Sequence, residues 1–353
     1  MSIYILNIIL IFLFGIFFFI LAPVKYNKTI FLIITFLQLL LIMGMRFEIG
    51  IDYNNYRSTF YLVDNTSFVQ LKDLSENSIE IGYLLLNKIV SIFTTDVELM
   101  FLVTSFLILF LVYRAVYIHS SIVWLSIYLF SVEAYIASFN ITRQYIAVAL
   151  LFYSYKYIKD KKFIKFLIIV LCASLFHTSV LFFIPIYFIL RINFTGIKML
   201  LSIFFGFLLS FFIEPIISLS QKYFYEDYTQ MSFGMTFGNV QTVIIALFYF
   251  TITIIFKSAL LKQNKNNIIL INWSFVNLGL SIFSINTWLI TRLMPYSSIF
   301  FILLIPELAV SIKNKLHKVL IVSIFIILTF IQYYNTIVDP LNKLIPYRSI
   351  LFL

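Results

Sequence analysis

Charged residues are scarce in this sequence. Asp, Glu, Lys and Arg make up 11% of the 353 residues, whereas hydrophobic residues make up 62%. A water-soluble domain carries roughly 25% charged residues, so this chain cannot cover a soluble fold with polar side chains. Long apolar runs recur from end to end, and no alternating pattern of barrel strands is present. The sequence therefore predicts an all-α integral membrane protein, because helices satisfy their own backbone groups in lipid.

Cysteine is almost absent, and repeats are not recognisable. The single cysteine, Cys172, lies inside an apolar run, which excludes a disulfide within the chain and favours a packing role. No Cys/His cluster suggests a metal site. The first apolar run, 3–21, lacks the basic start and the small-residue cleavage site of a signal peptide, so we expect a retained span.

Positive charge is concentrated in short loops between the apolar runs. A net charge of +10 would suggest nucleic acid in a soluble protein, but here the lysines and arginines indicate membrane orientation. Basic loops alternate with less basic ones, and the positive-inside rule assigns the basic loops to the cytoplasm. Both termini and the longest loop, 46–97, are then outside, in a single transmembrane domain, 1–353. We predict about twelve spans, at 3–22, 28–45, 98–118, 121–138, 142–158, 163–176, 178–191, 197–217, 239–256, 268–287, 296–312 and 319–334.

One apolar segment tests this topology. Residues 163–190 would form a helix about 42 Å long, which exceeds a hydrocarbon core of roughly 30 Å. We favour two short helices that meet near His177, which would lie close to the outer surface. One long bent helix is the alternative, and it would reverse the orientation of every later loop.

Four arginines are expected on the outer side, where the positive-inside rule disfavours them: Arg46, Arg143, Arg292 and Arg348. Each is close to a predicted membrane boundary, where arginine is costly and is usually paired or functional. Guanidinium groups that converge on one pocket would suit phosphate oxygens. The alternative for each arginine is an anchor that extends from a helix end to the interface.

Other polar and aromatic residues are expected on the same side. The candidates are Asp52, Tyr53, Tyr56, Glu80, His177 and Tyr347. The tyrosines of the 46–61 stretch could stack on sugar rings or form an interfacial aromatic belt. Asp52 could cap a helix, Glu80 could be a solvated loop acid, and His177 could be a core histidine. Glu226 and Asp227 are expected to be solvated.

A series of motifs along the chain resembles a known family. In order these are "MRFEIGIDYNNYRSTF", "EIGYLLLN", "TRQYIAVAL", "SLFHTSVLFFIPIYFI", "TRLMPYSSIF" and "IPYRSIL". Together they resemble the EpsG family, the Wzy-like polymerases of bacterial exopolysaccharide, capsule and O-antigen. Ile51 departs from the small hydroxyl residue that often precedes the Asp-Tyr pair, but the aspartate and both tyrosines remain.

This resemblance implies a polytopic helix bundle like the GT-C-type glycosyltransferases that use lipid donors. Such an enzyme, in the bacterial inner or plasma membrane, joins oligosaccharide units carried on undecaprenyl diphosphate at the outer face. Donor and acceptor are both lipid-linked, no metal or other cofactor is implied, and a flippase and a chain-length regulator are possible partners. The absence of a DxD motif agrees with a donor other than a nucleotide sugar.

The chemistry of that transfer suggests a role for each candidate. The four arginines would bind the leaving diphosphate, and Tyr53, Tyr56 and Tyr347 would contact substrate. His177, Asp52 or Glu80 would accept the proton of the attacking hydroxyl. We expect inversion by direct displacement, with a covalent intermediate as the alternative.

Three other functions stay open at this point. A flippase for lipid-linked oligosaccharides would have a similar number of spans, but we would expect internal repeats and interrupted helices. An O-antigen ligase would share the donor, with its large outer loop late in the chain. A membrane acyltransferase would need a histidine but has little use for four outer arginines.

Overall fold

The computed structural model describes residues 2–21, 26–76, 79–194, 198–199, 201, 208, 237–285 and 288–352. The predicted span 197–217 is almost entirely outside these residues, as are Glu226 and Asp227. Within the described ranges the chain is helical, and its single β-type contact is an isolated bridge between Arg46 and Ser349. The chain forms two compact units, unit 1 (Met1–Ile184 and Ile305–Leu353) and unit 2 (Pro185–Leu304).

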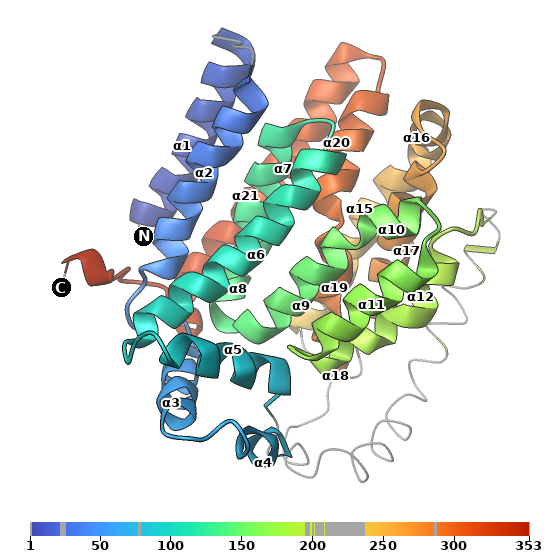
Figure 1. Cartoon of the computed structure of the whole chain (residues 1–353). Helices are drawn as coiled ribbons and strands as arrows, with labels where there is room; N and C mark the ends of the chain where they lie inside the picture. Colours follow the sequence, from blue (N-terminus) through green and yellow to red (C-terminus); the bar gives the residue numbers. More distant parts are fainter. Residues whose placement is uncertain are drawn as a thin grey trace. The chain divides into compact units, whose positions relative to one another are not determined.

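Unit 1 contains most of the helices drawn in Figure 1. Its N-terminal stretch consists of α1 (Ser2–Ile16) with the π-helical turn η1 (Phe17–Leu21), α2 (Asn27–Gly44), α3 (Tyr53–Asp64), α4 (Leu71–Glu76), α5 (Ile81–Ser91) and α6 (Val97–His119). Next come α7 (Val123–Leu129), the π-helical turn η2 (Phe130–Ala134), α8 (Ala137–Asn140), α9 (Thr142–Tyr153), α10 (Tyr155–Lys159), α11 (Phe163–Ser174) and the 3₁₀ turn η3 (Thr178–Phe182). After unit 2 it is completed by α21 (Lys315–Val338), η5 (Pro340–Asn342) and η6 (Ile350–Phe352).

Four helices in the described residues are long and apolar enough to cross a membrane. They are Ile3–Leu21, Asn27–Gly44, Val97–His119 and Lys315–Val338. The number rises to six if each of two bent helix pairs is one span. Several helices expected as spans are shorter than 18 residues, including α11 and α17. The protein is thus a helical membrane protein, and the total of about twelve spans stays a prediction.

Different parts of the sequence lie at the two ends of unit 1. At one end, α3, α4 and α5 lie beyond the ends of α2 and α6 (Figure 1). The C-terminal segment reaches this end too, because Ile350 N donates to Met45 O at 3.0 Å, and the N-terminal Tyr4 hydroxyl donates to Leu344 O at 3.0 Å. Chain start, chain end and the 46–97 loop therefore share one end, as the predicted topology requires.

Residues from the predicted basic loops meet elsewhere in unit 1. The Lys28 amine donates to the carbonyl of Tyr117, near the end of α6. The rings of His119 and Tyr155 pack edge to face, with centroids 5.0 Å apart. The alternation of loop types along the sequence thus corresponds to two separate sets of contacts. Which set faces the cytoplasm stays a prediction.

The break predicted near His177 is present. Helix α11 ends at Ser174, and His177 has an extended backbone, with φ −161° and ψ 114°, before η3 begins. A continuous helix through 163–190 is therefore not formed. This interruption presents the His177 side chain at the end of α11.

Unit 2 is built on a pair of apolar helices. Helix α15 (Phe237–Ile255) packs against α17 (Asn267–Phe283), and the short α16 (Lys257–Gln263) connects them. Helices α18 (Trp288–Thr291) and α19 (Met294–Ser298) follow, while α12 (Phe183–Ile189) and α20 (Phe301–Ser311) extend across the boundaries between the units. The stacked rings of Trp273 and Phe300, 4.1 Å apart, contribute to the core of this unit.

Candidate functional site

Two side chains from distant parts of unit 1, those of Arg143 and His177, meet at the carboxylate of Glu80. Glu80 Oε2 lies 2.6 Å from Arg143 Nη1, and Glu80 Oε1 lies 2.7 Å from His177 Nδ1. The backbone amide of Thr178 also approaches Oε1, at 3.4 Å. The side chains of Glu80, His177 and Arg143 keep 13%, 19% and 28% of their surface exposed. This Glu80 cluster is thus half-buried yet open to a ligand.

Close backbone packing positions Glu80. The residue immediately precedes α5, and two residues later Gly82 N donates to Leu175 O at 2.7 Å. A Cβ at Gly82 would lie 2.6 Å from that same oxygen. Only glycine permits this approach, which fixes the start of α5 against the break that carries His177.

Arg143 reaches the cluster from the first turn of α9. Its guanidinium carbon lies 6.0 Å from the centre of the Tyr83 ring, and Tyr83 packs edge to face with Tyr56. Tyr56 in turn donates its hydroxyl to Asn140 O at 2.7 Å, two residues before α9 begins. Helices α3, α5 and α9 thus meet around these rings.

The surroundings of Glu80 favour its ionised form. Burial raises the pKa of Glu80, but the hydrogen bond with His177 and the charge of Arg143 lower it, so the pKa lies below its ordinary value. An ionised carboxylate can only accept hydrogen bonds, so His177 Nδ1 must carry the hydrogen between them. In the neutral imidazole, Nε2 is then the free base.

Arg46 is fully buried, unlike the residues of the Glu80 cluster. Its guanidinium carbon lies 4.7 Å from the ring centre of Phe101 and 5.0 Å from that of Phe139. Its Nη1 donates to Met43 O at 2.5 Å. With 0% of its surface exposed, Arg46 holds together the turn after α2. A substrate contact at Arg46, as the sequence predicts, would require this packing to open.

The remaining candidates of the 46–61 stretch surround the start of α3. Tyr53 is buried and stacks on Phe101, with ring centres 4.5 Å apart. Tyr56 is buried as well, and burial raises its pKa to about 12, so its hydroxyl acts as a donor. Asp52 precedes α3, where its Oδ1 lies 3.4 Å from Asn55 Nδ2, and it remains partly exposed. Neither tyrosine presents a free ring face for a sugar in this arrangement.

The C-terminal candidates lie beside the same turn. Tyr347 donates its hydroxyl to Ile42 O at 2.9 Å, and Arg348 Nη1 lies 3.1 Å from Glu48 Oε2 in an exposed ion pair. Residues 46–50 and the C-terminal segment therefore form one packed surface. Arg292 belongs to unit 2, between α18 and α19, and its side chain is exposed. Its predicted contribution to the site stays a prediction.

Sequence reasoning missed two residues that organise this region. Gly50 has a φ of +103°, and a Cβ there would lie 2.6 Å from Asn140 Oδ1. The same oxygen accepts from Ile51 N at 2.7 Å. Asn140, the last residue of α8, therefore ties the 46–61 stretch to the turn between α8 and α9. The "SFNITRQ" motif contains this asparagine, but nothing in the sequence signals a partner 89 positions away.

No metal site is evident among these groups. In the residues that the structure describes, no three His, Cys, Asp or Glu side chains lie close enough to hold an ion. What the Glu80 cluster offers is a histidine oriented through Nδ1 and a guanidinium beside it. Such a pair can accept a proton and bind an anion at neighbouring points.

Comparison with known proteins gives one family. Residues 29–349, nearly the whole chain, match the model of the EpsG family. No curated protein and no solved structure gave a significant match. The match includes the Glu80 cluster, the 46–61 stretch and the C-terminal segment as far as Ser349.

Proposed function

We propose that this chain, which belongs to the EpsG family, is a glycosyltransferase that polymerises lipid-linked oligosaccharide units at the outer face of a bacterial membrane. Membership supports a polysaccharide polymerase in broad terms. The donor in our proposal is an oligosaccharide on undecaprenyl diphosphate, and the acceptor is the next lipid-linked unit. The observation that carries the proposal is the bridging of Arg143 and His177 by Glu80.

In the proposed reaction, His177 is the base. Its Nε2 takes the proton from an acceptor hydroxyl, whose oxygen forms a bond to the anomeric carbon of the donor. The bond from that carbon to the diphosphate breaks, and its electron pair leaves with undecaprenyl diphosphate. Glu80 holds the ring through Nδ1 and stabilises the imidazolium that forms, as a carboxylate does in a catalytic triad.

Arg143 is placed to bind the departing charge. Nη1 of its guanidinium lies 2.6 Å from Glu80 Oε2, and a guanidinium has five N–H donors. The others can approach phosphate oxygens, which gain charge as the bond breaks. We also propose Arg292 as a second cation for the diphosphate and Asp52 as the carboxylate that orients the acceptor. Arg348, paired with Glu48, would join the binding surface at its rim.

The surface glycan of the host tests this proposal. The gene is deleted and complemented with wild type, His177→Ala, Arg143→Ala or the control Asp160→Asn. Asp160 forms an exposed ion pair with Lys162, so its change to an amide should have little effect. Immunoblots of membranes check that each variant is present.

The glycan ladder on a gel gives the outcome. We expect single repeat units without a ladder in the deletion strain and in the two site variants, and a normal ladder with the control. Absence of any repeat unit at the outer face would indicate a flippase instead. A normal ladder in both site variants would show that the Glu80 cluster has no part in the reaction.

A further inference from the structure

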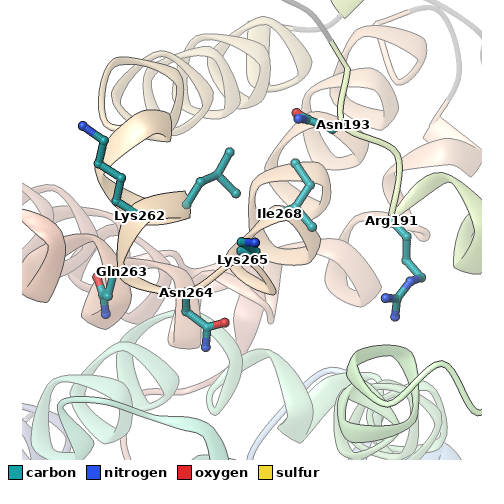
Figure 2. A pocket seen from close by; sticks show the side chains of 8 residues that line it. Arg191, Asn193, Lys262, Gln263, Asn264, Lys265 and Ile268 are labelled. Atoms are coloured by element: carbon teal, nitrogen blue, oxygen red, sulfur yellow. The ribbon is translucent and has the colours of Figure 1, made fainter.

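Unit 2 contains a basic pocket of about 820 Å³ that the proposed reaction does not use. It lies at the corner between α16 and α17, facing the segment that follows α12 (Figure 2). Its lining consists of Arg191, Asn193, Leu261, Lys262, Gln263, Asn264, Lys265 and Ile268. Three of these side chains are cationic, three are amides, and the described lining includes no carboxylate. This composition favours an anion.

Buried hydrogen bonds hold the two walls of this pocket together. Asn272 of α17 is fully buried, and its Nδ2 lies 2.9 Å from Leu190 O and 2.8 Å from Ile192 O, on either side of Arg191. On the far side of Asn193, Phe194 O accepts from Lys257 Nζ at 2.7 Å. The segment that carries Arg191 and Asn193 is thus fixed to α16 and α17 from both sides. These hydrogen bonds hold the pocket in a defined shape within unit 2.

The predicted topology assigns this pocket to a membrane surface. Helices α15 and α17 are apolar and pack side by side, and α16 bends by 60° from the end of α15. The predicted topology has spans at 239–256 and 268–287, so the corner that joins these helices would lie at headgroup depth. Lys262 and Lys265 are exposed at this corner, while Leu261 and Ile268 add apolar surface to the lining.

We propose that this pocket binds the phosphate headgroup of an anionic phospholipid. Guanidinium and ammonium groups would contact the phosphate oxygens, the amides of Asn193, Gln263 and Asn264 would hydrogen-bond to the glycerol or headgroup oxygens, and Leu261 and Ile268 would contact the first methylene groups. By the predicted topology this is the cytoplasmic leaflet, whose anionic lipids attract basic clusters at helix ends. The site would anchor the α15–α17 pair at a defined depth, independently of the proposed glycosyl transfer.

Native mass spectrometry of the purified full chain tests this site. The protein in mild detergent is mixed with phosphatidylglycerol or with phosphatidylcholine, and the dissociation constant of the first bound lipid is measured. We expect tighter binding of phosphatidylglycerol. The double variant Lys262→Ala, Lys265→Ala should weaken that binding roughly thirtyfold, and Lys265→Ala alone about fivefold, from the usual contribution of a lysine at an anionic surface.

Matched variants distinguish lipid binding in the pocket from a general effect of positive charge. Lys313→Ala with Lys315→Ala removes the same charge from exposed positions of unit 1, and binding should change less than twofold. Lys262→Arg with Lys265→Arg should bind like wild type. Equal weakening by the two double alanine variants would overturn the proposal.

The nature of the ligand is decided in a separate experiment. Inorganic phosphate at millimolar concentration should not displace phosphatidylglycerol from wild type. If phosphate displaces the lipid, and alone raises the thermal unfolding midpoint of wild type but not of the double variant, the pocket binds a soluble phosphate and the lipid proposal fails. All affinities are compared among variants whose unfolding midpoints without lipid match that of wild type.

Discussion

Single residues of the Glu80 cluster carry different parts of the proposed chemistry. His177 supplies the base, Arg143 the cation, and Glu80 the contacts that orient both. The roles differ in what each residue touches, so the three substitutions should not behave alike. Measurements with purified enzyme and a defined lipid-linked repeat unit can separate them.

Loss of the base should lower the rate of the chemical step most directly. We expect His177→Ala to reduce kcat by roughly 10²–10⁴-fold, the usual contribution of a positioned general base. Part of the activity should return at high pH, where the acceptor hydroxyl needs less help in losing its proton. An unchanged kcat with the same pH profile would contradict this role.

Loss of the cation should affect the leaving group. Arg143→Ala is expected to lower kcat by about 10²–10³-fold, by analogy with other preorganised charges. Arg143→Lys should recover little of the loss, because an ammonium group lacks the planar fork of guanidinium. A donor with a better leaving group should suffer less from the substitution, which a purely structural role of Arg143 would not produce.

The Glu80 ion pairs should also make stability depend on pH. Because the pKa of Glu80 is lowered in the folded protein, its contribution is fully present above the ordinary glutamate pKa of about 4.3 and is lost as pH falls through the lower folded value. Thermal unfolding of detergent-solubilised protein should show a midpoint that falls with acid below about pH 5. In Glu80→Gln this part of the pH dependence should vanish, whereas Asp160→Asn should retain it.

At the scale of elements, the start of α5 packs directly against the break after α11. The amide of Gly82 and the carbonyl of Leu175 bring the two segments together, and this contact sets the distance between Glu80 and His177. The length of the 163–190 segment predicts the break itself. It does not predict the contact with α5, since nothing in the sequence pairs residue 82 with residue 175.

A methyl group at Gly82 should disturb this contact. The Cβ of Gly82→Ala would lie 2.6 Å from Leu175 O, so α5 must shift and carry Glu80 away from His177. We expect polymerisation to fall at least tenfold, which corresponds to about 1.4 kcal/mol, together with a lower unfolding midpoint. Gly279→Ala is the matched control, because no atom lies within 4 Å of a Cβ at that position. Activity equal to wild type in Gly82→Ala would show that the α5 contact does not set the site.

At the scale of the whole molecule, the loops of unit 1 fall into two groups. Both termini and the 46–97 loop contact one another, whereas Lys28, Tyr117, His119 and Tyr155 meet in a second set of contacts. The positive-inside rule assigns the first group to the outside. The sidedness follows from charge and can be measured directly.

Cysteine labelling measures this orientation. Cys172→Ser gives a chain without cysteine, to which Ser67→Cys or Lys313→Cys is added, both at exposed positions. A membrane-impermeant maleimide applied to whole cells should label residue 67, and should label residue 313 only after permeabilisation. The reverse pattern would place the Glu80 cluster on the cytoplasmic side and would exclude polymerisation at the outer face.

The sequence by itself determined that the protein is helical, membrane-embedded and a member of its family. Apolar composition and run length are properties of each segment alone, and a helix satisfies its backbone without partners. For the same reason most expected spans coincide with helices, such as 28–45 with Asn27–Gly44. Arg143, Glu80 and His177 were identified singly, because a polar residue near an apolar boundary is visible in one dimension.

Only the tertiary structure decided which of these candidates meet. Glu80 contacts Arg143 and His177, which lie 63 and 97 positions later in the sequence. These contacts depend on backbone packing at Gly82. The burial of Arg46 between two aromatic rings depends on Phe101 and Phe139, from two other parts of the chain. The sequence pattern marked Arg46 and Arg143 alike, since both follow from the cost of charge near lipid. Long-range packing buries Arg46 and leaves Arg143 open to a ligand.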